Sequence, residues 1–230
     1  IHNRCDDSVG MVVGDRTMII RRSRGYAPLP VRLKQDSEGV FAAGAELLSS
    51  FALGKGKQAC MSQYIGDLKN METYEFYRSS YDRFRNMFRF TPKVLIHDLH
   101  PDYLSSRFAR ELSEAEGGLP LIPVQHHHAH IGSVMADHGL EGDVIGFSYD
   151  GLGLGDDGHL WGAELMTANL KDYTRFCQFE YMPLPGGDRA SEEPWRMAVS
   201  YLHGCYGSSL VDLTIPMCAE LSRDSIEILT

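Results

Sequence analysis

The 230-residue sequence has few cysteines, no long apolar run and no signal peptide, and each of these deficits excludes a class of protein. Its five scattered cysteines form no Cys-x-x-Cys pair, which argues against a disulfide scaffold or a zinc ribbon and favours a reducing cytoplasm. No apolar run approaches the ~18 residues that a membrane-spanning helix needs. With 43% hydrophobic and 23% charged residues, the composition predicts a packed cytoplasmic globule that does not enter a membrane.

Positive charge is scarce outside the first 34 residues. The net charge is −9, with seven basic and three acidic groups in residues 1–34 against 15 basic and 28 acidic groups in residues 35–230. This step predicts a boundary near residue 35, and the acidic body argues against nucleic acid as a partner. The basic cluster at 21–24 is either a solvated strand end or a contact for a nucleotide phosphate. Because the sequence lacks an initiator Met and stops within an apolar pattern, we expect a fragment of a longer protein.

Hydrophobic patterns alternate between strand and helix along the chain, which predicts an α/β fold with a mixed sheet. Loose alternation over residues 8–21, with a turn at Gly14-Asp15, predicts a hairpin. Further strands are expected at 40–45, 50–61, 160–170 and 173–182, fully buried strands at 93–98, 119–124 and 143–150, and helices at 70–87, 102–116, 126–138 and 192–202. A Tyr, Phe and Met stripe on the first of these helices is expected to face the core.

Four histidines stand within residues 126–130, in the order His-His-His-Ala-His. If this run opens a helix, His126 and His130 lie on one face, one turn apart, while His128 points to the opposite side. Two imidazoles so placed hold one metal ion, and Asp150 is a candidate third ligand. Such a set suits zinc or iron and leaves positions open for substrate. A surface histidine patch without function is the alternative.

A glycine-rich segment follows Asp150. Gly151, Gly153 and Gly155 would let backbone N–H groups approach a phosphate closely, at the end of a strand near the histidines. Glycine and aspartate are also common in hairpin turns, and Asp157 reads as a plain turn residue. No Gly-Lys-Ser/Thr follows, so the segment is not a P-loop.

Motifs in order along nearly the whole chain resemble the HypF family, the carbamoyltransferases of nickel–iron hydrogenase maturation. They stand at residues 1–9, 21–26, 44–46, 62–67, 98–103, 124–130, 150–158 and 160–162. The resemblance implies that residues 1–30 are the tail of a YrdC-like domain. It implies that residues 31–230 are a C-terminally incomplete, TsaD-like carbamoyl-transfer domain of the actin-like ATPase (ASKHA) fold.

The resemblance also implies a site and a reaction. A divalent metal, zinc or iron, would be held by His126, His130 and Asp150, which would be the catalytic set. Carbamoyl phosphate and ATP would give carbamoyl-AMP, and the carbamoyl group would pass to the C-terminal Cys thiolate of HypE as a precursor of the cyanide ligands. Ser8 and Arg21 would contact the nucleotide from the YrdC-like tail.

The chain departs from the family pattern at two places. Leu48-Ser49-Ser50 stands where the family shows Lys-Asn-Thr, and Tyr64 stands where a His is usual. Both departures weaken the expected nucleotide handling at the first hairpin. They keep two other functions open, a non-catalytic metal-binding module that docks HypE and an O-carbamoyltransferase acting on a small molecule. The fragment alone is not expected to catalyse the full reaction.

Overall fold

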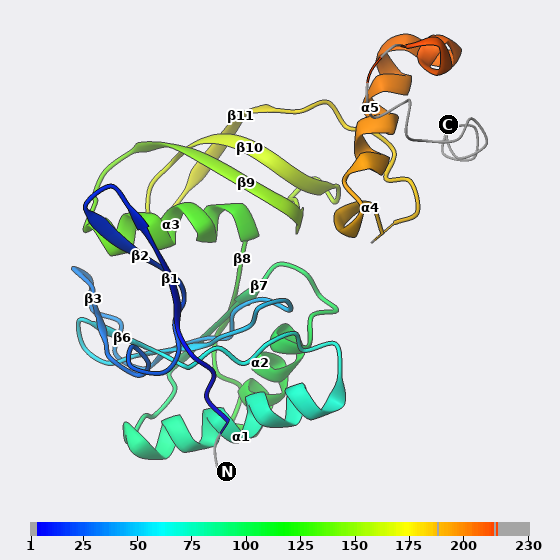
Figure 1. The fold of residues 1–230 in the computed structure, drawn as a ribbon. Coiled ribbons are helices and arrows are strands. Elements are labelled where there is room, and N and C mark those ends of the chain that lie inside the picture. The colour runs from blue at the N-terminus through cyan, green and yellow to red at the C-terminus, as the bar shows by residue number, and fades with distance from the viewer. Residues whose placement is uncertain (1–3, 188, 214, 216–230) are drawn as a thin grey trace.

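The computed structural model describes residues 4–187, 189–213 and 215 (Figure 1). Its lower layer is a six-stranded sheet in the order β3-β6-β5-β4-β7-β8. These strands are β3 (Val31–Arg32), β4 (Val40–Ala42), β5 (Ala52–Gly54), β6 (Gln58–Met61), β7 (Val94–Asp98) and β8 (Leu121–Val124). β4, β7 and β8 run parallel and the other neighbours antiparallel, so the predicted α/β fold with a mixed sheet is confirmed.

Two helices cover this sheet and build the main core (Figure 1). They are α1 (Met71–Met87) and α2 (Leu104–Ala115). The side chain of Asn70 caps α1 by accepting a hydrogen bond from the N–H of Thr73, at 2.8 Å. The predicted stripe on α1 is buried in its middle turns, whereas Met71 and Met87 are exposed at the helix ends.

Aromatic rings fill the space between α1, α2 and the sheet. Tyr81 and Phe108 both meet Phe41 edge-on, with centroid separations of 4.9 and 5.9 Å. The hydroxyl of Tyr77, which is fully buried, donates to the carbonyl of Ala43 at 2.6 Å. This bond satisfies a backbone acceptor just after β4, so the aromatic core also fixes the end of this inner strand.

The upper layer is a three-stranded antiparallel sheet in the order β11-β10-β9, with α3 (His126–His138) on one face (Figure 1). Its strands are β9 (Val144–Leu154), β10 (Leu160–Ala168) and β11 (Tyr173–Gln178). Ile131 and Met135 of α3 pack on Met166 and Ala168 of β10. Gly146 lies directly beneath this contact, because a Cβ there would stand 2.6 Å from Cγ1 of Ile131.

Two strands predicted to be buried are edge strands instead. β8 ends the lower sheet, and Ile122 on it is 46% exposed. β9 ends the upper sheet, and its Ile145, Phe147 and Tyr149 are largely exposed. β9 also continues to Leu154, so the glycine-rich segment is largely strand and not loop.

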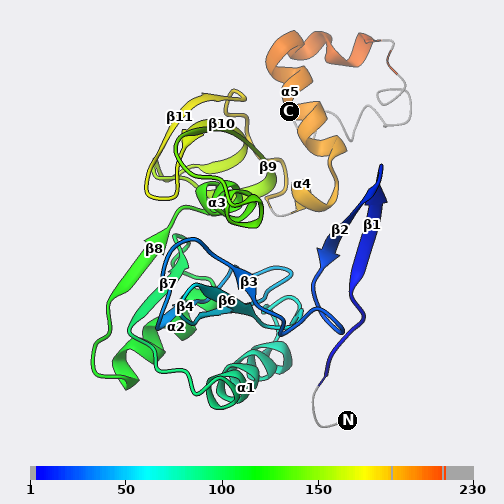
Figure 2. The same ribbon diagram turned by 90° about the vertical axis from the view of Figure 1, so that its left-hand side faces the viewer.

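The remaining elements lie outside these two layers. Figure 2 shows the hairpin of β1 (Val9–Val13) and β2 (Arg16–Arg21) standing beside the lower sheet, with the predicted turn between its strands. After β11 come α4 (Arg189–Glu192), α5 (Trp195–Tyr206) and a 3-10 helix at Gly207–Asp212. The helix predicted from 192 begins instead at Trp195, following Pro194. Within the described residues no helix is both long enough and apolar enough to cross a membrane.

We expect Tyr77→Phe to lower the free energy of unfolding by about 1–3 kcal/mol, because the buried carbonyl of Ala43 loses its only side-chain donor. Urea unfolding followed by far-UV circular dichroism measures the change. Tyr149→Phe is the matched control, since Tyr149 is 71% exposed, and we expect it to change stability by less than about 0.5 kcal/mol. Equal stability of both variants would contradict a stabilising role for the buried hydroxyl.

Candidate metal centre

The histidine run begins where β8 ends. Gln125 caps α3, and its side-chain oxygen accepts the N–H of His128 at 2.8 Å. Gly139 ends the helix in the left-handed conformation, at φ 61°. Because β7 and β8 are parallel neighbours, the first residue of α3 stands beside Asp98, the last residue of β7. The helix predicted at 126–138 is confirmed with its Gly139 cap.

α3 and β9 bring the three predicted ligands together. Nε2 of His126 lies 3.0 Å from Oδ2 of Asp150, and Nε2 of His130 lies 3.6 Å from the same oxygen. One ligand atom from each side chain lies within 4.8 Å of the other two. Among the described residues this is the one group of three or more His, Cys, Asp or Glu side chains with such spacing. The geometry is the one that helix periodicity predicts for positions four residues apart.

Two carboxylates flank the imidazole of His126. Nδ1 donates to Oδ2 of Asp98 at 2.6 Å, while Nε2 faces Asp150. The hydrogen bond to Asp150, and then the one to Asp98, raise the pKa of His126 to about 9. Hydrogen bonds from His126 and His130 hold the pKa of Asp150 far below its usual range. The site therefore favours a positive charge between α3 and β9.

The donor set fits a divalent metal ion. Two imidazole nitrogens and one carboxylate oxygen are the ligands of open zinc and iron sites. His126 is only 16% exposed, whereas His130 is 54% exposed, so the group is shielded on one side and open on the other. An open side is what a site for substrate needs. Binding of a metal by these three residues remains a prediction.

The other two histidines of the run serve packing. The amide nitrogen of Gln125 donates to Nδ1 of His127 at 3.2 Å, so Nε2 carries the proton and donates to the carbonyl of Gly162 at 3.0 Å. Burial lowers the pKa of His127, which keeps the ring neutral. On the opposite side, Nε2 of His128 donates to the carbonyl of Asn169 at 2.7 Å. Both rings tie α3 to the upper sheet.

The glycines after Asp150 have different surroundings. A Cβ on Gly153 would stand 2.6 Å from Cε1 of His127, and one on Gly155 would overlap the ring of Trp161. Packing thus accounts for both glycines, and the N–H of Gly155 already donates to His159 at 2.8 Å. Gly151 has open space around its Cα, and its N–H donates to Oδ1 of Asp150 at 2.6 Å. Phosphate binding by these glycines remains a prediction.

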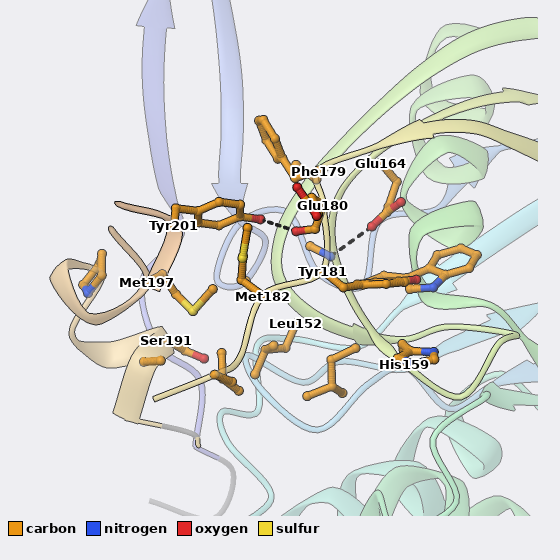
Figure 3. Close-up of a pocket in the computed structure, with 18 residues that line it drawn as sticks. Leu152, His159, Glu164, Phe179, Glu180, Tyr181, Met182, Ser191, Met197 and Tyr201 are labelled. Carbon is orange, nitrogen blue, oxygen red and sulfur yellow. Dashed lines mark hydrogen bonds between the residues drawn. The ribbon is translucent and has the colours of Figure 1, made fainter. Parts of the chain in front are cut away.

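A cavity of about 460 Å³ opens beside Gly151, between the upper sheet and α4–α5. Figure 3 shows Met197 and Tyr201 on one side of it and Glu164 and His159 on the other. The lining is mostly apolar and aromatic. Glu164 is its one deeply buried carboxyl group, and burial raises the pKa of this group. The sequence patterns did not indicate this cavity, because residues from four separate segments line it.

Ser8 and Arg21 make contacts in and around the hairpin. The hydroxyl of Ser8 donates to the carbonyl of Arg24 and accepts the N–H of Ser23, both at 2.9 Å. The guanidinium of Arg21 lies over the ring of Tyr64, 4.5 Å from its centroid. Tyr64, which stands where the family usually has a His, therefore contacts Arg21 of the hairpin. A nucleotide contact by Ser8 or Arg21 remains a prediction.

Two family models match consecutive parts of the chain. They are the HypF Kae1-like domain at residues 35–137 and the second subdomain of the carbamoyltransferase Kae1-like domain at residues 146–229. Carbamoyltransferase HypF2 of Cupriavidus necator is 43% identical over 203 residues, covering 87% of the chain and 25% of that protein. Carbamoyltransferase HypF of Rhizobium leguminosarum is 41% identical over 199 residues, covering 86% of the chain and 26% of that protein.

Solved structures give the same family. The crystal structure of full-length HypF in the phosphate- and nucleotide-bound form superposes with a TM-score of 0.86 at 39% identity, over 99% of this chain and 29% of that one. The structure of T. kodakarensis HypF superposes with a TM-score of 0.84 at 39% identity, over 91% of this chain and 28% of that one. The chain spans about a quarter of the length of the curated relatives named above.

We expect the affinity of this centre for Zn²⁺ to rise with pH. A metal ion must displace the proton that His126 holds up to a pKa of about 9. From roughly pH 6 to pH 8, each unit frees about tenfold more neutral imidazole, so affinity should rise by up to about tenfold per unit. Competition with a chromophoric chelator at a series of pH values measures this slope.

The stability of the metal-free protein provides the control, because it should move in the opposite direction. The pKa of His126 is raised on folding, so its contribution to stability is complete below about pH 6.5 and is lost as pH rises through about 9. A Zn²⁺ affinity that does not change with pH would show that His126 is not a ligand.

Proposed function

The chain belongs to the HypF family of Kae1-like domains, and from this membership we propose that it is the carbamoyl-transfer part of an ATP-dependent carbamoyltransferase. One observation carries the proposal. The open His126, His130 and Asp150 group stands at the start of α3, and Gly151, the residue after Asp150, lines a cavity large enough for a small organic group. The metal centre would hold the reactive carbonyl of a substrate. The cavity would hold the rest of that substrate.

The proposed substrate is carbamoyl-AMP, made from carbamoyl phosphate and ATP, and the proposed acceptor is the C-terminal Cys thiolate of HypE. The product would be a precursor of the cyanide ligands in nickel–iron hydrogenase maturation. Support comes from relatives named as carbamoyltransferases and from a similar structure that holds phosphate and nucleotide. The thiolate sulfur bonds to the carbamoyl carbon, the bond from that carbon to the phosphate oxygen breaks, and AMP leaves with the electron pair.

The residues of the chain have separate tasks in this scheme. His126 and Asp150, the more shielded pair, would fix the metal, and His130 would complete the site on its open side. A divalent ion bound there would polarise the carbamoyl carbonyl as a Lewis acid. The N–H of Gly151 points at the Asp150 carboxylate and so orients that ligand. The exposed side at His130 leaves room for the thiolate of a protein acceptor.

The cavity suits the adenosine part of carbamoyl-AMP. Gly151 and Leu152 line it, so part of its wall follows Asp150 directly in the sequence. Aromatic and Met side chains make up much of the wall, and such surfaces stack on a flat base. The carbamoyl end would then lie at the metal and the base in the cavity, with the phosphate near Gly151.

A second function is a metal-binding module that docks HypE without turnover. It is favoured by Leu48, which stands where the family pattern has Lys. Leu48 is 69% exposed, and an apolar leucine side chain cannot supply the cation that a lysine would offer to a phosphate. The experiment below separates the two functions.

We expect His130→Ala to remove one equivalent of bound metal from the complete protein and to abolish carbamoylation of HypE. Adenylation, followed as pyrophosphate exchange that depends on ATP and carbamoyl phosphate, should persist because it belongs to another domain. Metal content is measured by mass spectrometry and transfer by radiolabelled carbamoyl phosphate.

His138→Ala on the same helix is the matched control, since His138 is 57% exposed and contacts none of the three ligands in the described structure. It should leave metal and transfer unchanged. Retention of both by His130→Ala would refute the site. A wild type that binds metal and HypE but transfers nothing would favour the docking module.

We expect Ser191→Trp to weaken AMP binding by at least about tenfold, because Ser191 lines the cavity and is exposed enough to accept the larger ring. Isothermal titration of the complete protein with AMP measures this loss, and Zn²⁺ affinity should be unchanged. Ser208→Trp, at an exposed position away from the cavity lining, is the control. Equal AMP affinity in both variants would place adenosine elsewhere.

A further inference from the structure

We propose that Asp98 is the positioning residue of the metal centre, which fixes His126 with its lone pair on Nε2 directed at the ion. The inference rests on the proposed metal site and assigns a task to a residue outside the ligand set. Asp98 ends β7 and is 9% exposed. Its carboxylate has one partner on each oxygen: Oδ1 accepts the N–H of His100 at 2.8 Å, and Oδ2 accepts Nδ1–H of His126 at 2.6 Å.

The direction of the second bond decides the form of the imidazole. An ionised carboxylate only accepts, so Nδ1 of His126 must carry the proton. Once a metal ion displaces the proton on the other nitrogen, Nε2, that nitrogen would offer its lone pair to the ion beside Asp150. A carboxylate behind a metal-bound histidine also makes the imidazole a stronger ligand.

Asp98 is itself held in place. Its backbone carbonyl accepts the hydroxyl of Ser106 at 3.2 Å, and Ser106 is fully buried in α2. The carboxylate of Asp98 is thus held by the loop after β7, and its backbone is held by α2. A side chain so fixed can orient its partner without losing much conformational entropy of its own.

The contact also joins the two layers of the molecule. Asp98 belongs to the lower sheet and Asp150 to the upper sheet, and α3, which begins with His126, lies between the two sheets (Figure 1). In the described structure no second carboxylate backs His130, whose ring is 54% exposed. Asp98 is therefore the one acidic group that orients a ligand of this centre from behind.

The test uses Asp98→Asn in the complete protein, with Zn²⁺ as the probe. Asn keeps the shape of Asp98 and a hydrogen-bond acceptor but removes the charge. We expect Zn²⁺ affinity, measured by chelator competition, to fall by about 10–100-fold. We also expect the His126 Nδ1 proton of the zinc-loaded protein to move upfield in NMR spectra, because its hydrogen bond to a charged partner is lost. Asp98→Glu should recover part of the affinity.

Glu46→Gln is the matched control. Glu46 is also a buried carboxyl group beside α2, where it accepts the N–H of Leu104 at 2.7 Å, and none of its contacts reaches His126. It should bind Zn²⁺ like the wild type. The proposal is overturned if Asp98→Asn binds Zn²⁺ within about twofold of wild type with the proton unmoved, or if Glu46→Gln weakens binding equally. If the folded wild type binds no Zn²⁺, the metal site itself fails.

Discussion

The side chain of Gln125 is the interaction on which the site depends. Its oxygen caps α3, and its nitrogen donates to the carbonyl of Leu154 and to His127, each at 3.2 Å. One buried amide thus sets where the helix begins, which tautomer the central histidine adopts and how the β9–β10 hairpin lies on the helix. A buried amide left unsatisfied costs about 1–3 kcal/mol, so loss of any of these partners would weaken the junction.

The junction at Gln125 places the histidines of α3 among acidic side chains. One imidazole lies between two carboxylates that come from different sheets. Negative charge is therefore concentrated where α3 meets both layers. Such a place attracts a cation, and the apolar cavity next to it can exclude water from a bound organic group.

Local patterns in the sequence predicted much of this arrangement. Four-residue spacing placed His126 and His130 on one face, and the Gly139 cap ended the helix where expected. What the patterns missed depends on distant segments. The contact of Asp98 with His126 and the contact of Gln125 with Leu154 join residues 28 and 29 positions apart in the sequence. The same holds for β8 and β9, since an apolar run looks alike whether it lies inside a sheet or at its edge. A distant residue also accounts for Gly153, because the ring of His127 packs where a side chain at 153 would stand.

The histidine run also limits how this segment can change during evolution. Each residue of an α-helix turns the chain by about 100°. One residue inserted between His126 and His130 would therefore place these two side chains about 140° apart around the helix, so that they no longer share the face toward Asp150. A substitution at a position between them changes one side chain, whereas an insertion separates the two predicted ligands. This segment is thus constrained in its length as well as in its residues.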